Sequence, residues 1–135
     1  MSEKKKCLVV DDSPIIREIA VRIIADCGFA TVEAENSALG VECCRDQNVD
    51  AVLLDWDLPS MGALDFLRGA AELEKKPVIV LCATENDHQQ FALAKAAGAA
   101  FHVLKPFDKQ AIEVAFREAG LIESDAEDIK AAVND

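Results

Sequence analysis

The sequence predicts an α/β protein in which a parallel β-sheet carries helices on both faces, and two observations lead to this fold class. Short, almost wholly apolar runs alternate along the chain with longer segments in which apolar residues recur at helical spacing. The short runs lack strict polar–apolar alternation, which is typical of strands buried on both faces, as in parallel sheets. A strand–helix unit repeated five times favours a doubly wound parallel sheet.

The expected strands are the apolar runs at residues 7–10, 30–32, 51–54, 78–82 and 100–104. The first helix is expected to begin at Pro14, with Ser13 as its N-cap, and to end before Gly28. The other four helices are expected over about residues 37–46, 63–73, 87–97 and 108–120.

Length and charge limit the classes of function that the chain can have. A chain of 135 residues is long enough for one domain. We expect this domain over residues 1–120, followed by an acidic tail or extra helix at 121–135. The net charge of −11 argues against nucleic-acid and anionic-membrane partners. No apolar run approaches the length of a membrane span, and the N-terminal run is too short for a signal peptide.

The cysteines favour a reducing compartment, so we expect a cytoplasmic protein. Five cysteines are present and none forms a C-x-x-C pair, which argues against a zinc site or a disulfide framework. Three of them stand among apolar residues and are expected to be small buried side chains: Cys7, Cys27 and Cys82.

Acidic residues follow two of the predicted strands, and a lysine follows a third. Asp11 and Asp12 end the first strand, Asp55 ends the third with Asp57 beyond it, and Lys105 ends the fifth. In open α/β sheets, ligands bind outside the carboxyl ends of the strands. Carboxylates gathered there repel one another unless a cation binds, and oxygen ligands suit Mg²⁺. A carboxylate beside Mg²⁺ and a lysine is placed to attack a phosphoryl group and form an aspartyl phosphate.

Each of these motifs also has an ordinary structural explanation. Asp11 and Asp12 could simply begin a turn and cap the first helix, without any role in binding. The run from Asp55 to Pro59 could be a simple strand-to-turn transition, and Lys105-Pro106 could be only a turn. Their joint placement at three strand ends is what these separate explanations leave out.

The chain resembles the receiver domains of bacterial response regulators over residues 5 to 120. The matching motifs, in order, are Leu8-Val-Val-Asp-Asp12, Val52-Leu-Leu-Asp-Trp-Asp-Leu-Pro59, Pro77-Val-Ile-Val-Leu-Cys-Ala83, Ala97-Gly-Ala99 and Lys105-Pro-Phe107. The resemblance implies a flavodoxin-like, five-stranded parallel sheet of order 2-1-3-4-5 with five flanking helices.

The resemblance also implies roles for single residues. It implies that Asp55 accepts the phosphoryl group, that Asp12 binds Mg²⁺ directly and that Asp11 acts mainly through water. Asp57 stands where the family uses a backbone carbonyl on the metal. Lys105 is expected to bind the phosphoryl group and to precede a cis peptide bond. His102 stands at the position of the switch side chain, and a partly buried histidine without a role is the alternative.

The chain departs from the family pattern at two places. Cys82 stands where the family has Ser or Thr, and a thiol is a weaker donor than a hydroxyl. Thr84 could take over the phosphoryl contact, or it could be a surface loop residue. After Pro59, Gly62 either replaces an acidic residue or follows a one-residue deletion.

The resemblance predicts a single-domain response regulator of a two-component system or phosphorelay. A histidine kinase or histidine phosphotransfer protein would supply the phosphoryl group, and a downstream protein would read the altered surface. The expected activity is limited to self-directed phosphotransfer and autodephosphorylation. One alternative is a pseudo-receiver that binds partners without phosphorylation. The other is a phosphatase of the haloacid dehalogenase type, which normally carries its Asp-x-Asp motif on the first strand.

Overall fold

The computed structural model describes residues 4–123 of the chain. Within them, five parallel strands form one sheet in the order β2-β1-β3-β4-β5. The strands are β1 (Lys6–Val10), β2 (Ala30–Ala34), β3 (Ala51–Asp55), β4 (Val78–Ala83) and β5 (Phe101–Leu104). The predicted fold class and the strand order implied by the resemblance are therefore confirmed.

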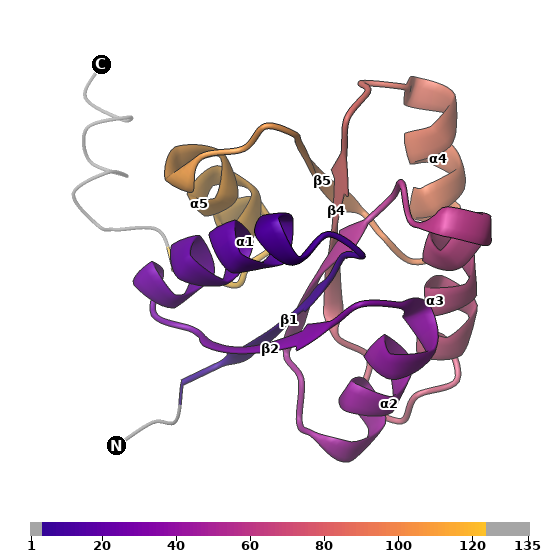
Figure 1. The fold of residues 1–135 in the computed structure, drawn as a ribbon, viewed down its shortest axis with the longest axis horizontal. Coiled ribbons are helices and arrows are strands. Elements are labelled where there is room, and N and C mark those ends of the chain that lie inside the picture. The colour runs from indigo at the N-terminus through magenta and orange to yellow at the C-terminus, as the bar shows by residue number, and fades with distance from the viewer. Residues whose placement is uncertain (1–3, 124–135) are drawn as a thin grey trace.

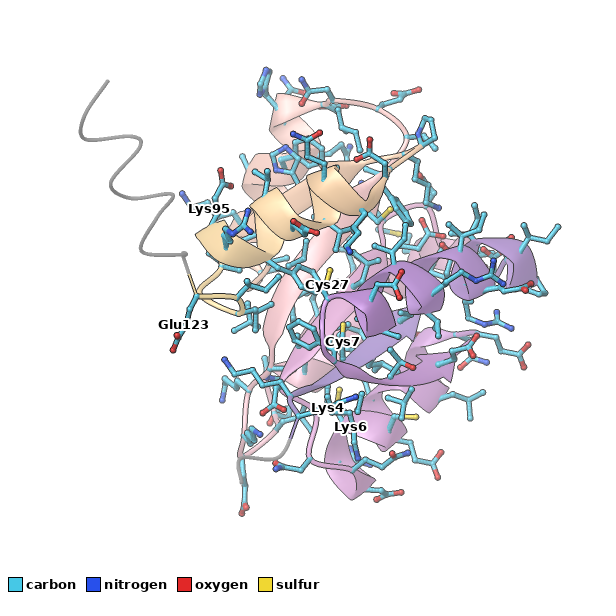
Figure 2. The ribbon with its side chains drawn as sticks, turned by 90° about the vertical axis from the view of Figure 1, so that its left-hand side faces the viewer. Lys4, Lys6, Cys7, Cys27, Lys95 and Glu123 are labelled. Atoms are coloured by element: carbon cyan, nitrogen blue, oxygen red, sulfur yellow. The ribbon has the colours of Figure 1, made fainter. Side chains whose placement is uncertain are left out.

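Helices cover both faces of the sheet (Figure 1). α1 (Pro14–Asp26) and α5 (Lys109–Glu118) lie on one face, and the other face carries the remaining helices, α2 (Ser37–Asp46), α3 (Gly62–Ala70) and α4 (His88–Ala96). Asparagine, serine and aspartate side chains cap four of the helices at Asn36, Ser13, Asp87 and Asp108. Figure 2 looks onto the α1–α5 side, where Cys7 and Cys27 lie near the junction of the two helices.

The alternation of side chains along the strands divides the core into two layers. In β3, Val52 and Leu54 pack under α2, α3 and α4, whereas Ala51 and Leu53 pack under α1 and α5. Asp55 follows in the same alternation, so its side chain belongs to the α1–α5 side of the sheet. Both layers are apolar, which explains why the central strands contain no polar–apolar alternation.

Several element boundaries differ from the sequence prediction by one to three residues, and the differences in β2 and α3 have clear physical reasons. β2 continues past Val32 to Ala34, because an edge strand is only half-buried and tolerates the exposed Glu33. α3 ends at Ala70, whereas periodicity extended it to Leu73. Leu73 still packs into the core, but it does so from a turn in which its amide donates to the Ala70 carbonyl.

The connection after β3 is strained. A single 3₁₀ turn spans Pro59–Met61, and both Ser60 and Met61 have positive φ, at 56° and 59°. This left-handed conformation disfavours residues that carry a Cβ atom. The strain therefore falls in the segment where the sequence departs from the family pattern.

Two further sequence expectations concern the C-terminal tail and membrane spans. The acidic tail or extra helix expected at residues 121–135 falls mostly outside the described residues, which end at Glu123. Among the helices of residues 4–123, none is long and apolar enough to cross a membrane.

Candidate functional site

The carboxyl ends of three strands place the predicted site residues at one edge of the sheet. Asp55 is the last residue of β3, and Asp11 directly follows β1, the neighbouring strand. The Asp11 amide donates to the Ala34 carbonyl, which extends the sheet pairing into the turn. Lys105 directly follows β5, and its amide donates to the Ala83 carbonyl at the end of β4. The site is thus built on rigid strand ends.

Three carboxylates and one ammonium meet at this edge. Asp11, Asp12 and Asp55 each contribute a carboxylate oxygen, and these three oxygens lie within 4.8 Å of one another. The Lys105 ammonium bridges two of these residues, with its Nζ 3.2 Å from Asp11 Oδ2 and 3.1 Å from Asp55 Oδ1. Three negative groups face one positive group, so the cluster keeps an excess of negative charge that a bound cation would balance.

Burial and mutual charge shift the pKa values of the two bridged groups. Burial raises the pKa of Asp55, although the Asp57 amide and the Lys105 ammonium both act against the shift. Burial also disfavours the Lys105 ammonium, but the carboxylates of Asp55 and Asp11 outweigh it and raise the pKa of Lys105. At neutral pH the lysine is therefore a firmly charged cation beside a buried carboxylate.

Asp11 and Asp12 differ in their surroundings although they are adjacent. Asp11 is buried, and its Oδ1 accepts a hydrogen bond from the Ser13 amide at 2.9 Å. The Asp12 side chain is exposed at the rim. Ser13 caps α1 through its own hydroxyl, which accepts from the Ile16 amide. Asp11 therefore stabilises the turn and also belongs to the acidic cluster.

Asp57 and Thr84 connect the loop after β3 with the loop after β4. Asp57 Oδ2 accepts from the Thr84 hydroxyl at 3.2 Å and from the Thr84 amide at 3.3 Å. The Asp57 amide in turn donates to Asp55 Oδ1 at 2.9 Å. Thr84 is an exposed loop residue, yet two bonds join it to the segment that carries Asp55.

Cys82, a candidate phosphoryl-binding residue, and His102, the candidate switch residue, lie in very different environments. Cys82 pairs with Asp55 across the β3–β4 ladder and is buried, and burial raises the pKa of its thiol to about 12. His102 is exposed on β5 and stacks on Phe91 of α4, with ring centroids 4.1 Å apart. Two other cysteines were expected to be buried. Cys7 is buried, whereas Cys27 is only partly buried.

The sequence interpretation missed Arg17, which contacts the site from α1. Its Nη1 donates to the Asp11 carbonyl oxygen at 2.7 Å, and its Nε lies 3.1 Å from Glu33 Oε1 of β2. A signal was available, because Arg17 shares the buried stripe of the helix with Ala20 and Ile24. A charged residue on an apolar helical stripe usually has a specific partner.

The chain is similar to known proteins over most of its length. Residues 7–117 match the family model of the response regulator receiver domain. The chain is 32% identical to the chemotaxis protein CheY of Pseudomonas aeruginosa over 112 residues, which are 80% of this chain and 90% of that protein. It is 34% identical to the chemotaxis protein CheY1 of Helicobacter pylori over 116 residues, with the same two coverages.

Solved structures share the fold. The chemotaxis response regulator CheY4 of Vibrio cholerae superposes with a TM-score of 0.80 at 23% identity, covering 87% of this chain and 99% of that one. A second match is to a co-crystal structure of the Saccharomyces cerevisiae histidine phosphotransfer protein Ypd1 and the receiver domain of Ssk1. Its TM-score is 0.77 at 17% identity, with 89% of this chain and 91% of that one covered. The chain belongs to the response regulator receiver domain family.

Proposed function

We propose that this receiver domain accepts a phosphoryl group from a phosphohistidine onto Asp55 and acts as a response regulator. The observation that carries the proposal is the placement of Asp55 between Lys105 and two further carboxylates at the carboxyl edge of the sheet. Similarity to CheY proteins supports the same signalling role. The cytoplasmic location expected from the cysteines remains a prediction.

The chemistry that we propose for Asp55 follows from its hydrogen bonds. Asp55 Oδ1 is held by the Asp57 amide and the Lys105 ammonium, and within residues 4–123 no donor is bound to Oδ2. In the proposed step, Oδ2 attacks phosphorus, the P–N bond of the phosphohistidine breaks, and the imidazole leaves with the electron pair. The Lys105 ammonium then pairs with an oxygen of the transferred group.

The acidic cluster fits a divalent cation, and we propose Mg²⁺. The fit rests on the donor set, because three carboxylates share one edge with a single ammonium. Hard oxygen ligands of this kind suit Mg²⁺. Asp11, Asp12, Asp55 and the Asp57 carbonyl would hold the ion. When bound, it would neutralise charge on the phosphoryl oxygens during transfer.

We propose that the partner docks on the first turns of α1. Ile15 and Ile19 lie one helical turn apart and are 69% and 44% exposed, on the helix that begins beside Asp12. Large apolar side chains exposed next to a reactive group are typical of a contact surface. The yeast structure pairs a receiver domain with a histidine phosphotransfer protein, which supports a phosphohistidine carrier or kinase as the partner here.

The readout of phosphorylation is the part of the proposal in which this chain differs from its family. We propose that Thr84 or Cys82 contacts the phosphoryl group and that His102 responds. Thr84 already contacts the Asp57 side chain, so it would exchange this acceptor for a phosphoryl oxygen. His102 would have to leave its stack on Phe91 to alter the surface formed by β4, β5 and their helices.

The test is chemical phosphorylation of the purified protein. Incubation with Mg²⁺ and phosphoramidate, whose P–N bond stands in for phosphohistidine, should add one phosphoryl mass that hydroxylamine removes. Asp55→Asn should abolish the addition. Asp65→Asn, which changes an exposed aspartate of α3, should not. Addition to Asp55→Asn at the wild-type level would contradict the assignment.

A second function, a phosphorylation-independent pseudo-receiver, is favoured by one observation. The residue paired with Asp55 across the ladder is the buried Cys82 thiol, a poor donor whose pKa is raised to about 12. Beryllofluoride with Mg²⁺ separates the two functions. Amide shifts centred on Asp55 support phosphorylation, and no shift at millimolar concentrations supports the pseudo-receiver.

A further inference from the structure

We infer that Arg17 is a positioning residue for the acidic cluster, oriented for this task by Glu33. The inference rests on the proposed function, because it concerns how the chain holds the carboxylates that would bind Mg²⁺. The peptide that joins Asp11 to Asp12 is the covalent link between the buried and the exposed acidic residue.

Hydrogen bonds hold Asp11 at each of its four polar atoms. Its amide donates to the Ala34 carbonyl, and its carboxylate accepts from the Ser13 amide and from Lys105. Its carbonyl oxygen accepts a hydrogen bond from Arg17 Nη1 at 2.7 Å. This oxygen defines the plane of the Asp11–Asp12 peptide. Arg17 therefore determines how Asp12 is presented toward Asp55.

Asp12 has little else to hold it. Its side chain is exposed, and within residues 4–123 it makes no hydrogen bond or ion pair. Its position within 4.8 Å of the neighbouring carboxylates therefore depends on the backbone of the turn. A rotation of the Asp11–Asp12 peptide would move the Asp12 carboxylate away from the cluster.

Glu33 orients Arg17 from the edge strand β2. The Arg17 Nε lies 3.1 Å from Glu33 Oε1, and the arginine side chain is only 16% exposed. A guanidinium is planar, so two bonds at different nitrogens fix its orientation, which a lysine ammonium cannot reproduce. Glu33 also balances the arginine charge, and the pair adds no net charge next to the carboxylates.

Because Arg17 is positively charged, an electrostatic role and a positioning role predict opposite changes in Mg²⁺ affinity when the arginine is replaced. A cation near a metal site weakens binding of a divalent cation, so a purely electrostatic role predicts tighter Mg²⁺ binding after Arg17→Gln. A positioning role predicts weaker binding. Residues that hold metal ligands in place typically contribute 10- to 100-fold to affinity, and we expect a loss of about tenfold.

The experiment is a Mg²⁺ titration of the unphosphorylated protein, followed by the fluorescence of Trp56, the single tryptophan and the neighbour of Asp55. Arg17→Gln and Arg17→Lys should both weaken binding, and Glu33→Gln should weaken it less. Arg22→Gln is the matched control, because Arg22 pairs with Glu18 on the same helix but is 76% exposed. Thermal unfolding verifies that each variant is folded.

A second readout needs no metal. In the metal-free protein, Arg17→Gln should shift the backbone amide resonance of Asp12, and Arg22→Gln should leave it unchanged. Unchanged or tighter Mg²⁺ binding by Arg17→Gln, with wild type binding normally, would overturn the positioning role alone. Failure of the wild type to bind Mg²⁺ would instead overturn the metal site of the proposed function, and this inference with it.

Discussion

The ammonium of Lys105 lies 3.1 Å from Asp55 Oδ1 and also bonds Asp11, so one lysine joins the ends of β1, β3 and β5. The two carboxylates are buried, and the ammonium forms an ion pair with each of them. This cation stabilises the site in the absence of metal. It also competes with any divalent cation for the same oxygens.

Lys105→Met should therefore destabilise the metal-free protein and increase the stabilisation that Mg²⁺ binding provides. Removing one partner of a buried ion pair leaves an uncompensated charge and costs about 3 kcal/mol. Thermal unfolding with and without Mg²⁺ measures both effects. Lys109→Met is the control, because Lys109 is exposed and lies 3.9 Å from Glu113. Equal Mg²⁺ stabilisation of wild type and Lys105→Met would contradict the competition.

Asp55→Asn should stabilise the metal-free protein at neutral pH. The pKa of Asp55 is raised above 3.8 by burial, so the unfolded chain loses this proton first as the pH rises. The free energy of unfolding therefore falls as the pH rises from 3.8 to the pKa of Asp55 in the folded protein. At neutral pH the whole loss of stability is present. A gain of a few degrees in Tm would correspond to about 1 kcal/mol in a domain of this size.

The gain in stability from Asp55→Asn should shrink on acidification. It should vanish below this pH range, where the protonated Asp55 side chain is as uncharged as the asparagine that replaces it. Unfolding curves of the two proteins from about pH 3 to pH 7 measure this trend. A lower Tm for Asp55→Asn at neutral pH would mean that attraction to Lys105 outweighs the burial of the carboxylate.

Ser60→Gly should stabilise the loop after β3. Ser60 has φ 56° and ψ 38°, a left-handed conformation that costs residues with a Cβ about 1–2 kcal/mol. The greater freedom of glycine in the unfolded chain offsets part of this, so we expect a net gain of about 0.5 kcal/mol. Denaturant unfolding at constant m-value measures it. Ser60→Ala removes the hydroxyl but keeps the strain, and an equal gain there would refute the explanation.

Cys82→Ser should strengthen the structural response to phosphorylation. A serine hydroxyl at this position would offer a better donor than the buried thiol beside Asp55. The measurement is the set of amide shifts induced by beryllofluoride in β5, His102 included. Thr84→Ala, compared in parallel, should reduce the response if Thr84 transfers its hydroxyl from Asp57 to the phosphoryl group. A full response in wild type that neither variant changes would exclude both residues.

Much of the fold was predictable from residue order because burial imposes local patterns. Strands covered on both faces must be apolar throughout, as in the run Val52–Leu54, and helices need one apolar stripe. Caps such as Ser13 and Asp108 mark helix starts through bonds to nearby amides. The acidic cluster was also predictable, because the carboxyl ends of neighbouring parallel strands share one edge.

Contacts between residues far apart in sequence depended on the tertiary structure. Arg17 reaches Glu33 only because α1 packs beside the edge strand β2, and Thr84 meets Asp57 only because two loops converge above β3 and β4. The stack of His102 on Phe91 likewise depends on how α4 lies against β5. Periodicity describes which side of an element is buried, but a side-chain partner is set by the packing of one element against another. The residues of the acidic cluster were therefore predictable from the sequence, whereas the contacts of Arg17, Thr84 and His102 depend on the tertiary structure.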